Sequence, residues 1–483
     1  MSRSSFFRIL GPVSALAVFL FLKDQGENPA LMAGLVIWMA IWWISEAVPI
    51  PITSLLPLVL FPLLGIEDLH STAANYGNEV IYLFLGGFLI ALGIERSGAH
   101  RRIALGIVSL IGGSPARLML GIMVACAMLS MWINSTAATL VMLPIALSLL
   151  DDEDAPVLVR DRLTIPLLLS VAYGATIGGM ATPVGTPPNL ILKGFLQNRS
   201  ADGAAIGFGE WTAFGIPIAV VLIAFAWLVL SRIVFRVGKE PLGDADSIAA
   251  RRKALGPLTG TEFRSLLVFG AVALAWITGD DLDLSEDLVV KGWRSISFLA
   301  GVGDASIAVA GAIALFVIPA VRTSVMDSTP RLMDWDFAVV RVPWGVLLLI
   351  GGGFALGSGV ESSGLSRLIG LALADLGDLP PVLLIGSVVL IVCLLSEVGS
   401  NTATASLVIP ILAGAADSWG MDLQALLIPA TLGASLGFML PVASPMQTIV
   451  FGTGRIPMQQ MVRAGVWMDL FGVLFFALVF GLL

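Results

Sequence analysis

The chain has 483 residues, of which 57% are hydrophobic and only 12% are charged, and its formal net charge is −8. Its mean hydropathy is +0.95, which leaves too little polar surface to cover a soluble globule of this size. Long uninterrupted apolar runs, such as those at 31–43 and 220–230, also exclude a membrane barrel built from short alternating strands. The composition therefore predicts an all-α polytopic membrane protein.

The first predicted span lies at the N-terminus. Arg3 and Arg8 precede an apolar stretch at 9–22, a pattern shared with signal peptides. Because no small-residue cleavage site follows and the next span begins near Leu31, we expect a retained helix. Apolar runs long enough to cross the bilayer recur from there to the C-terminus, and we expect about eleven transmembrane helices plus two segments of a different kind.

Charged residues gather in alternate connections between the spans. Basic residues cluster at 96–117, 232–264 and 322–341, whereas acidic residues cluster at 67–79 and 280–287. Basic connections face the cytoplasm in most membrane proteins. If the spans alternate, the N-terminus lies inside and the C-terminus outside, in an inner (cytoplasmic) or plasma membrane.

The chain carries two copies of one pattern. The residues Gly87, Glu95, Ser130, Thr136 and Pro144 reappear as Gly353, Glu361, Ser396, Thr402 and Pro410, always at an offset of 266 (353 − 87). Further on, the residues Gly179, Pro183 and Pro187 match Gly437, Pro441 and Pro445 at an offset of 258 (437 − 179). By the expected span count the two copies enter from opposite sides, so they form inverted repeats, an arrangement typical of transporters with a site near the bilayer midplane.

Each copy contains a charge-poor segment that is too long for one transmembrane span and too short for two. The first, 118–150, has 33 residues, and one straight helix of that length would measure about 50 Å. We therefore expect two re-entrant hairpins. Small polar residues stand at their middles, namely Asn134, Ser135 and Thr136 in the first copy and Ser400, Asn401 and Thr402 in the second. Such residues satisfy backbone groups that are freed where a helix breaks.

Each copy then continues into a proline-rich element. The sequences are Thr-Pro-Val-Gly-Thr-Pro-Pro-Asn at 182–189 and Leu-Pro-Val-Ala-Ser-Pro-Met-Gln at 440–447. Proline breaks helices, so each element should be discontinuous at mid-depth and four broken helix ends should converge. Helix N-termini suit a carboxylate or a sulfate, while unwound carbonyls and hydroxyls suit sodium.

The predicted site lacks a cationic side chain. We find no Lys, Arg or His in the four elements expected to form it, and His70 and His100 both fall in connections. An uncompensated dianion at mid-membrane is costly, and half-helix dipoles supply only about half a charge each. We therefore expect Na+ as the coupling ion. The other expected partners are a small dianionic substrate and the lipid bilayer, with no role for nucleic acid.

These motifs resemble those of the divalent anion/sodium symporter family, whose members carry dicarboxylates, citrate or sulfate. The resemblance rests on 42–51 (Trp-Trp-Ile-Ser-Glu-Ala-Val-Pro-Ile-Pro), on 182–189 and on the Ser-Asn-Thr motif at 400–402, and it extends over nearly the whole chain. It implies a homodimer in which a mobile transport domain moves against a scaffold domain as an elevator.

The resemblance also implies roles for particular residues. The first sodium site would be Ser130, Asn134, Ser135 and Gly185, and the second would be Ser396, Gly399, Asn401 and Ala443. The anion would contact Ser135, Thr136, Asn401 and Thr402, with Thr186, Pro187, Ser444 and Pro445 lining the pocket. The first motif departs from the family, because Asn134-Ser135-Thr136 places a hydroxyl where an amide is expected. The second loop departs as well, with Met446-Gln447 where Pro-Asn is common.

Five regions follow from this interpretation: scaffold helices at 1–115, transport domain at 116–235, a cytoplasmic linker at 236–262, scaffold helices at 263–379 and transport domain at 380–483. Glu397 is expected either to tie hairpin backbone or to couple protons. The predicted function is sodium-coupled symport of a divalent anion, a C4-dicarboxylate such as succinate or malate. The alternatives are a sodium-independent exchanger, a sulfate or citrate carrier, and an anion channel. An enzyme is not expected, because the site region offers no His or Cys cluster and no paired carboxylates.

Overall fold

The computed structural model describes residues 3–111, 114–150, 157–199, 206–238, 252–285, 288–299, 301–321 and 331–482. Within these ranges the protein is helical, apart from one antiparallel pair of short strands, β1 (Leu282–Ser285) and β2 (Leu288–Val290). Nine of the described helices are long and apolar enough to cross a membrane, and five shorter apolar helices accompany them. The predicted all-α polytopic class is confirmed.

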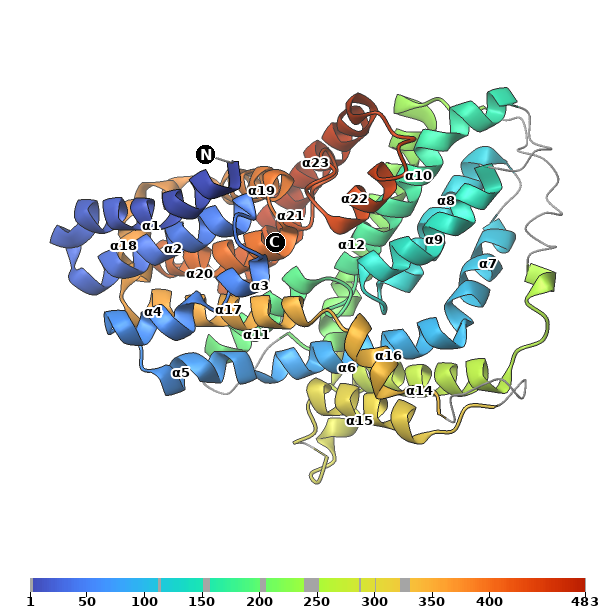
Figure 1. Ribbon diagram of the computed structural model, residues 1–483, viewed down its shortest axis with the longest axis horizontal. Helices are drawn as coiled ribbons and strands as arrows, with labels where there is room; N and C mark the ends of the chain where they lie inside the picture. Colours follow the sequence, from blue (N-terminus) through green and yellow to red (C-terminus); the bar gives the residue numbers. More distant parts are fainter. Residues whose placement is uncertain are drawn as a thin grey trace.

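The N-terminal part starts at one end of the molecule, and its last two helices extend toward the opposite end (Figure 1). It contains α1 (Arg3–Leu22), η1 (Lys23–Gln25), α2 (Glu27–Ser45), α3 (Ile50–Thr53), α4 (Leu56–Leu64), α5 (Leu69–Ala74), η2 (Asn75–Gly77), α6 (Glu79–Ser97) and α7 (Ala99–Ile111). The first two helices pack closely, because a Cβ added at Gly34 would lie 2.6 Å from the Ala15 carbonyl oxygen. The apolar stretch at 9–22 is thus part of a helix that packs against the next span.

The next segment contains the first predicted hairpin and the first proline-rich element. Its helices are α8 (Pro115–Ser130), α9 (Ser135–Leu150), α10 (Val157–Met180), α11 (Pro187–Arg199), α12 (Phe208–Leu228) and the π-helical turn η3 (Val229–Val234). The helix breaks fall at 131–134 and 181–186, where the sequence placed the polar tip and the prolines.

The second half repeats this order. It begins with α14 (Gly260–Ile277), the two strands, η4 (Trp293–Ser295), α15 (Asp304–Val317), α16 (Trp335–Arg341), α17 (Trp344–Ser362), α18 (Leu365–Ala372) and η5 (Ala374–Asp378). It ends with α19 (Pro381–Val398), α20 (Asn401–Trp419), α21 (Leu423–Ala434), α22 (Pro445–Phe451) and α23 (Met458–Gly481). Residues that match at the offset of 266 therefore lie in corresponding helices, α6 with α17, α8 with α19 and α9 with α20.

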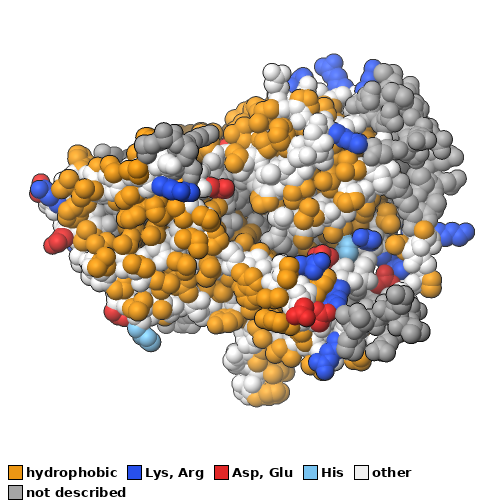
Figure 2. All heavy atoms as spheres, viewed as in Figure 1, with side chains coloured by type: hydrophobic (Ala, Val, Ile, Leu, Met, Phe, Trp, Pro, Cys, Tyr) orange, Lys and Arg blue, Asp and Glu red, His pale blue; other side chains and the backbone are white. Residues whose placement is uncertain are grey.

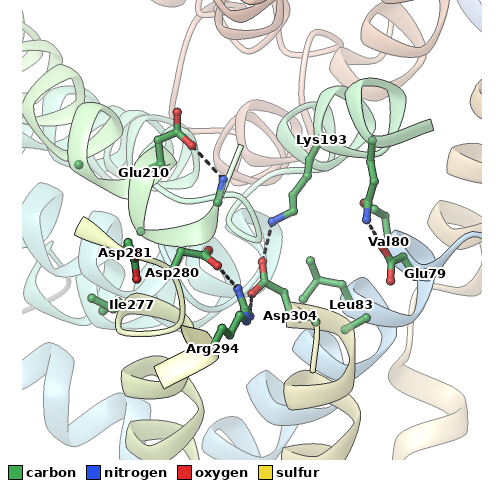
Figure 3. A pocket seen from close by; sticks show the side chains of 16 residues that line it. Glu79, Val80, Leu83, Lys193, Glu210, Ile277, Asp280, Asp281, Arg294 and Asp304 are labelled. Carbon is green, nitrogen blue, oxygen red and sulfur yellow. Dashed lines mark hydrogen bonds and ion pairs between the residues drawn. The ribbon is translucent and has the colours of Figure 1, made fainter. Parts of the chain in front are cut away.

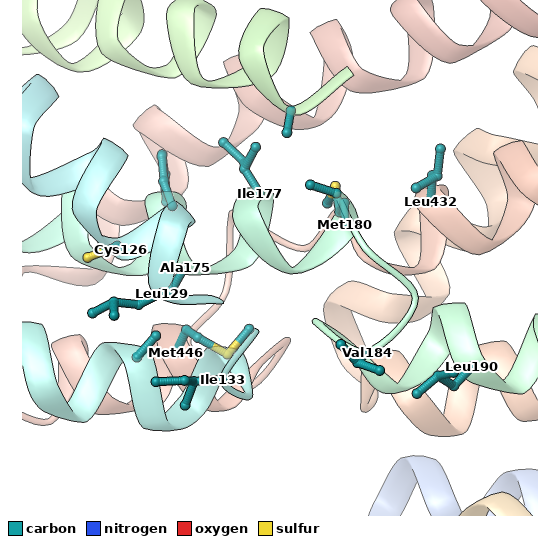
Figure 4. Close-up of a cluster of buried hydrophobic side chains, with 14 of the residues drawn as sticks. Cys126, Leu129, Ile133, Ala175, Ile177, Met180, Val184, Leu190, Leu432 and Met446 are labelled. Atoms are coloured by element: carbon teal, nitrogen blue, oxygen red, sulfur yellow. The ribbon is translucent and has the colours of Figure 1, made fainter. Parts of the chain in front are cut away.

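The first hairpin is held against α10 by a stripe of glycines. A Cβ added at Gly174 would lie 2.5 Å from the Met123 carbonyl oxygen, and one added at Gly178 would overlap the backbone of Ala127. Small residues spaced four apart let membrane helices approach closely, so dispersion contacts can replace the hydrophobic driving force that lipid does not supply. Figure 4 shows the apolar side chains around this contact, with Cys126 and Leu129 from α8 near Met446 from α22.

The outer surface is apolar over wide areas, as expected for a protein surrounded by lipid. Figure 2 shows hydrophobic side chains spread over the lobe that contains α1 and α2. Phe6, Ile9, Val13, Leu16 and Leu20 on α1 are all more than half exposed. Exposed apolar area of this extent requires a lipid or protein neighbour.

We predict that Gly178→Ala destabilises the fold by about 1–3 kcal/mol, because the added methyl group overpacks the contact with α8. A lower midpoint of thermal unfolding in detergent would show the effect. Gly270→Ala on α14 is the matched control, since no heavy atom lies within 4 Å of its added Cβ. Equal midpoints for the two variants would contradict close packing of α8 on α10.

Candidate functional site

The tip of the first hairpin is tied to the α10–α11 element by serine hydroxyls. Ser130 ends α8, and its Oγ donates to the Ala175 carbonyl oxygen at 2.5 Å and lies 2.7 Å from Ser135 Oγ. Ser135 begins α9, and its hydroxyl donates a hydrogen bond to the Gly185 carbonyl oxygen at 3.2 Å. Ser130 and Ser135 are both buried. The result is a compact group of hydroxyl and carbonyl oxygens at the helix break.

The tip of the second hairpin repeats this arrangement. Ser396 Oγ lies 2.6 Å from the Ala434 carbonyl oxygen and 2.7 Å from Asn401 Oδ1. A Cβ added at Gly437 would lie 3.2 Å from Ala443 Cβ and 3.5 Å from Asn401 Oδ1, so the unwound segment after α21 passes beside the tip. Ser396 and Asn401 match Ser130 and Ser135 at the offset of 266, and here an amide occupies the place of the Ser135 hydroxyl.

Buried side chains support the two unwound segments. Asn189 Nδ2 donates to the carbonyl oxygens of Gly179, Met180 and Thr182 at 3.2, 3.4 and 2.8 Å. In the second copy, the Glu397 carboxylate accepts hydrogen bonds from the N–H groups of Met439 and Leu440, both at 2.8 Å. Glu397 thus holds the backbone of the second broken helix rather than that of its own hairpin. Asp469 Oδ1 accepts from the neighbouring Phe438 N–H at 3.3 Å.

The two tips and the two loops meet at one cavity of about 310 Å³. Its lining is Ile50, Pro51, Asn134, Ser135, Thr136, Thr186, Pro187, Pro343, Gly345, Val346, Leu349, Ser400, Asn401, Thr402, Pro445 and Met446. The first residues of α9, α11, α20 and α22 are all among them. None of the described lining residues carries a charge. We call this space the central cavity.

Most of the residues expected to contact the anion line the central cavity. Seven do so, namely Ser135, Thr136, Asn401, Thr402, Thr186, Pro187 and Pro445. The exception is Ser444, which is buried and caps α22 by accepting a hydrogen bond from the Gln447 N–H.

The residues expected at the sodium sites fall into two groups, one at each tip. Ser130, Ser135 and Gly185 are joined by the contacts above, and Ser396, Asn401 and Ala443 gather around Gly437. Asn134 lines the cavity, but its Oδ1 accepts from the Thr136 N–H at 2.8 Å and so supports the start of α9. Gly399 ends α19 two residues before Asn401.

Sequence reasoning missed the carbonyl groups of Ala175 and Ala434. Ala175 lies in the last two turns of α10 and Ala434 is the last residue of α21, and both helices lead into an unwound segment. The residue type at these positions gives no indication of the contact, because only the backbone carbonyl oxygen takes part in the hydrogen bond. The glycines Gly179 and Gly437, which the repeat did identify, allow the unwound segments to pass close to the tips.

The expectation of no cationic residue in the four elements is wrong for α11. Lys193 lies one turn beyond the proline-rich motif and is buried, and its Nζ is 2.6 Å from Asp304 Oδ2 at the start of α15. Asp304 Oδ1 in turn accepts from Arg294 at 2.5 Å, and Arg294 also pairs with Asp280 at 2.6 Å (Figure 3). Lys193 therefore points away from the central cavity, and its charge is compensated by Asp304. This ion cluster borders a separate cavity of about 690 Å³.

A third cavity, of about 600 Å³, lies against one face of α9. Its lining is Glu95, Arg96, His100, Arg101, Ala137, Leu140, Val141, Pro144, Ile145, Ser148, Phe337 and Arg341. We call it the α9 vestibule. The repeat-related helix α20 differs, because α17 and α18 pack directly on it. A Cβ added at Gly353 would lie 2.8 Å from Ser406 Oγ, whereas one added at the matching Gly87 meets only Val184 at 4.0 Å.

A cavity inside a helical membrane protein, built from helix N-termini, hydroxyls and an amide at two broken helices, is the site of a membrane transporter. The family model described as citrate transporter, CitMHS, matches residues 40–433. The sodium-dependent dicarboxylate transporter SdcS of Staphylococcus saprophyticus is 36% identical over 480 residues, which cover 98% of this chain and 89% of SdcS. SdcS of Staphylococcus aureus is 38% identical over 481 residues with the same coverage.

The chain therefore belongs to the citrate transporter family, and its similarity to sodium-dependent dicarboxylate transporters confirms the resemblance found in the motifs. The solved structure of the YdaH transporter of Alcanivorax borkumensis has a similar fold at 16% identity, with a TM-score of 0.56 over 85% of this chain and 87% of that chain. The protein is an integral membrane transporter and not an enzyme.

We predict that Asn401→Ala lowers sodium-dependent binding of a C4-dicarboxylate at least about tenfold, equivalent to about 1.4 kcal/mol, because the cavity loses the amide at the second hairpin tip. Binding can be measured with radiolabelled succinate on the purified protein. Asn75→Ala is the control, because Asn75 lies outside the lining of the central cavity and its side chain donates a solvent-exposed hydrogen bond to the Ser71 carbonyl oxygen. Unchanged binding in Asn401→Ala, with an unchanged unfolding midpoint, would remove Asn401 from the site.

We predict that Asp304→Asn destabilises the protein by about 3–5 kcal/mol, because the buried Lys193 and the partly buried Arg294 lose a shared carboxylate. Thermal unfolding should show a large decrease, and adding Lys193→Met should restore part of it. Asp336→Asn, at an exposed position on α16, should leave the midpoint unchanged. Additive effects of Asp304→Asn and Lys193→Met would mean that the two residues do not interact.

Proposed function

We propose that the protein is a sodium-coupled symporter of a small divalent anion, a C4-dicarboxylate such as succinate or malate. The observation that carries this proposal is the central cavity, where four helices begin and no described lining residue is charged. Partial positive charge and free N–H groups at helix N-termini favour a carboxylate. The volume of about 310 Å³ is at the small end of ligand pockets, in keeping with a compact substrate.

Sodium ions supply the counter-charge in this proposal. A dianion away from bulk water needs more than fractional dipole charge to balance it. The two oxygen groups at the hairpin tips, around Ser130 and around Ser396, offer the hard ligands that sodium prefers. The SdcS relatives are named as sodium-dependent dicarboxylate transporters, which supports both the ion and the substrate class.

We further propose an elevator mechanism based on an inverted repeat, in a homodimer with the N-terminus inside and the C-terminus outside. The regions 116–235 and 380–483 would form the transport domain, and 1–115 and 263–379 the scaffold. The contacts of the second hairpin support this division. A Cβ added at Gly353 would contact Ser406, and one added at Gly414 would contact Ser366, so α20 packs tightly on α17 and α18. The residues that match Ser406, Gly414 and Ser366 in the first copy are Leu140, Ser148 and His100. These three line the open α9 vestibule.

The alternate state follows from this asymmetry. In it, α9 would pack on α6 and α7 as α20 now packs on α17 and α18, bringing Leu140 against Gly87. The vestibule would close, and a matching space would open beside α20. The central cavity would then be reached from the opposite side of the membrane, which is alternating access.

One observation favours sodium-independent exchange as a second candidate. At the first tip, the oxygens in contact are the hydroxyls of Ser130 and Ser135 and the Gly185 carbonyl oxygen, without an amide oxygen such as Asn401 supplies at the second tip. A serine in place of the family's asparagine also shortens the reach toward a cation. Under this alternative, substrate gradients alone would drive transport.

We predict that proteoliposomes take up succinate with an inward sodium gradient and not with potassium in its place. Sulfate and citrate, tested beside succinate in each salt, identify the anion class. Equal succinate counterflow with and without sodium would instead support exchange. A steady anion current without saturation would indicate a channel.

The alternate state predicts a cross-link between positions that are now apart. Gly87→Cys with Leu140→Cys should form a disulfide only in the state that closes the α9 vestibule, and its formation should stop transport reversibly. The matched control is Gly353→Cys with Ser406→Cys, which are in contact in this structure and should cross-link readily. Failure of the first pair to cross-link during turnover, with the control pair reacting, would contradict the elevator motion.

A further inference from the structure

The α9 vestibule carries more positive charge than its own carboxylates offset. Arg101 and Arg341 are exposed, and neither forms an ion pair within the part of the chain that the structure describes. Arg96 pairs with Asp334 through Nη2, while its Nη1 is buried and has no hydrogen-bond partner among the described residues. Glu95 is the one acidic residue in the described lining. Three guanidinium groups thus border the vestibule, one of them with an unused donor.

An aromatic ring fixes two of these guanidinium groups in place. The Phe337 ring lies 4.7 Å from the Arg96 guanidinium carbon and 3.9 Å from that of Arg341. Cation–π contacts of this kind reduce the freedom of long side chains before any ligand arrives. Asp334 strengthens the arrangement, because the Phe337 N–H and Arg96 hold the pKa of the Asp334 carboxyl below its usual value and keep it ionised.

The remaining titratable group in the vestibule adds no charge at neutral pH. Burial lowers the pKa of His100, and its Nδ1–H lies 3.1 Å from the Ile94 carbonyl oxygen. The attraction therefore comes from arginines, which stay charged at every physiological pH.

The α9 vestibule and the central cavity are lined by successive residues of one helix. Ser135 and Thr136 at the start of α9 line the central cavity, and Ala137, Leu140 and later residues of the same helix line the vestibule. From Thr136 to Ser148 this route measures about 18 Å at 1.5 Å per residue. An anion that leaves the uncharged central cavity on this side passes the arginines next.

We propose that the α9 vestibule contains a second anion site, formed by Arg96, Arg101 and Arg341, that binds the transported carboxylate as it enters or leaves the central cavity. Guanidinium groups bind carboxylates with paired hydrogen bonds, and Arg96 Nη1 is a buried donor without a partner among the described residues. This inference rests on the proposed function. It predicts an asymmetric transporter, because the arginines concentrate substrate at one entrance only.

The test is the half-saturating concentration of succinate in proteoliposomes of uniform orientation, measured separately for uptake and for efflux. Arg101→Gln with Arg341→Gln should raise this concentration about threefold to tenfold in the direction that starts from the vestibule, because electrostatic capture is lost. Raising the ionic strength from about 50 to about 300 mM should weaken apparent affinity in the wild type more than in the variant.

The control is Arg232→Gln with Arg463→Gln, which removes the same charge from exposed positions outside the vestibule. It should behave as the wild type. Sodium-driven uptake by the wild type in the same preparation tests the proposed function separately from the second site.

The second site would be overturned by an equal effect of both double variants, or by an unchanged half-saturating concentration in the Arg101 and Arg341 variant. A phosphate headgroup has similar chemistry to a carboxylate, so the assay is run in vesicles of phosphatidylcholine alone and with phosphatidylglycerol. An effect confined to the phosphatidylglycerol vesicles would assign the arginines to lipid and not to substrate. An effect of the same size in both vesicles supports the proposal.

Discussion

The arrangement of this transporter depends on the absence of side-chain charge from the described lining of the central cavity. Four helices begin there, and in the proposed function the attraction for an anion comes from the N-termini of these helices and from hydroxyl and amide groups. A fixed lysine or arginine would bind a dianion more tightly but would also hold it in place. Fractional dipole charge combined with mobile cations allows the site to fill and empty with the ions.

The helix breaks that create these N-termini are stabilised by a small set of buried polar contacts. Ser130 and Ser396 donate to carbonyl oxygens near the ends of α10 and α21, and so connect each hairpin tip to its neighbouring broken helix. Asn189 donates a hydrogen bond to a carbonyl oxygen of the first unwound segment, and Glu397 accepts one from an N–H group of the second. These bonds are internal to the two hairpins and their broken helices, so this part of the molecule has the connections needed to move as one body.

The sequence predicted this site well where side chains carry the signal. The duplicated tripeptides and proline motifs located both tips, both breaks and most of the cavity lining, because proline and small polar residues have few other uses within apolar runs. It could not predict the carbonyl groups of Ala175 and Ala434, which contribute only backbone atoms. It also missed Lys193, because its partner Asp304 follows much later in the chain and no local pattern connects them. The difference in packing between α9 and α20 was equally hidden, since the two helices share one repeat.

The distance in sequence between Lys193 and Asp304, 111 residues, affects how the protein is made. As the chain leaves the ribosome, α11 is complete long before α15 emerges, so its ammonium group has no carboxylate to neutralise it at that stage. An unpaired charge in an apolar helix opposes stable insertion. Stable packing of α11 is therefore expected only once Asp304 of the second half is in place. The ion cluster thus ties membrane assembly of one half of the molecule to the arrival of the other.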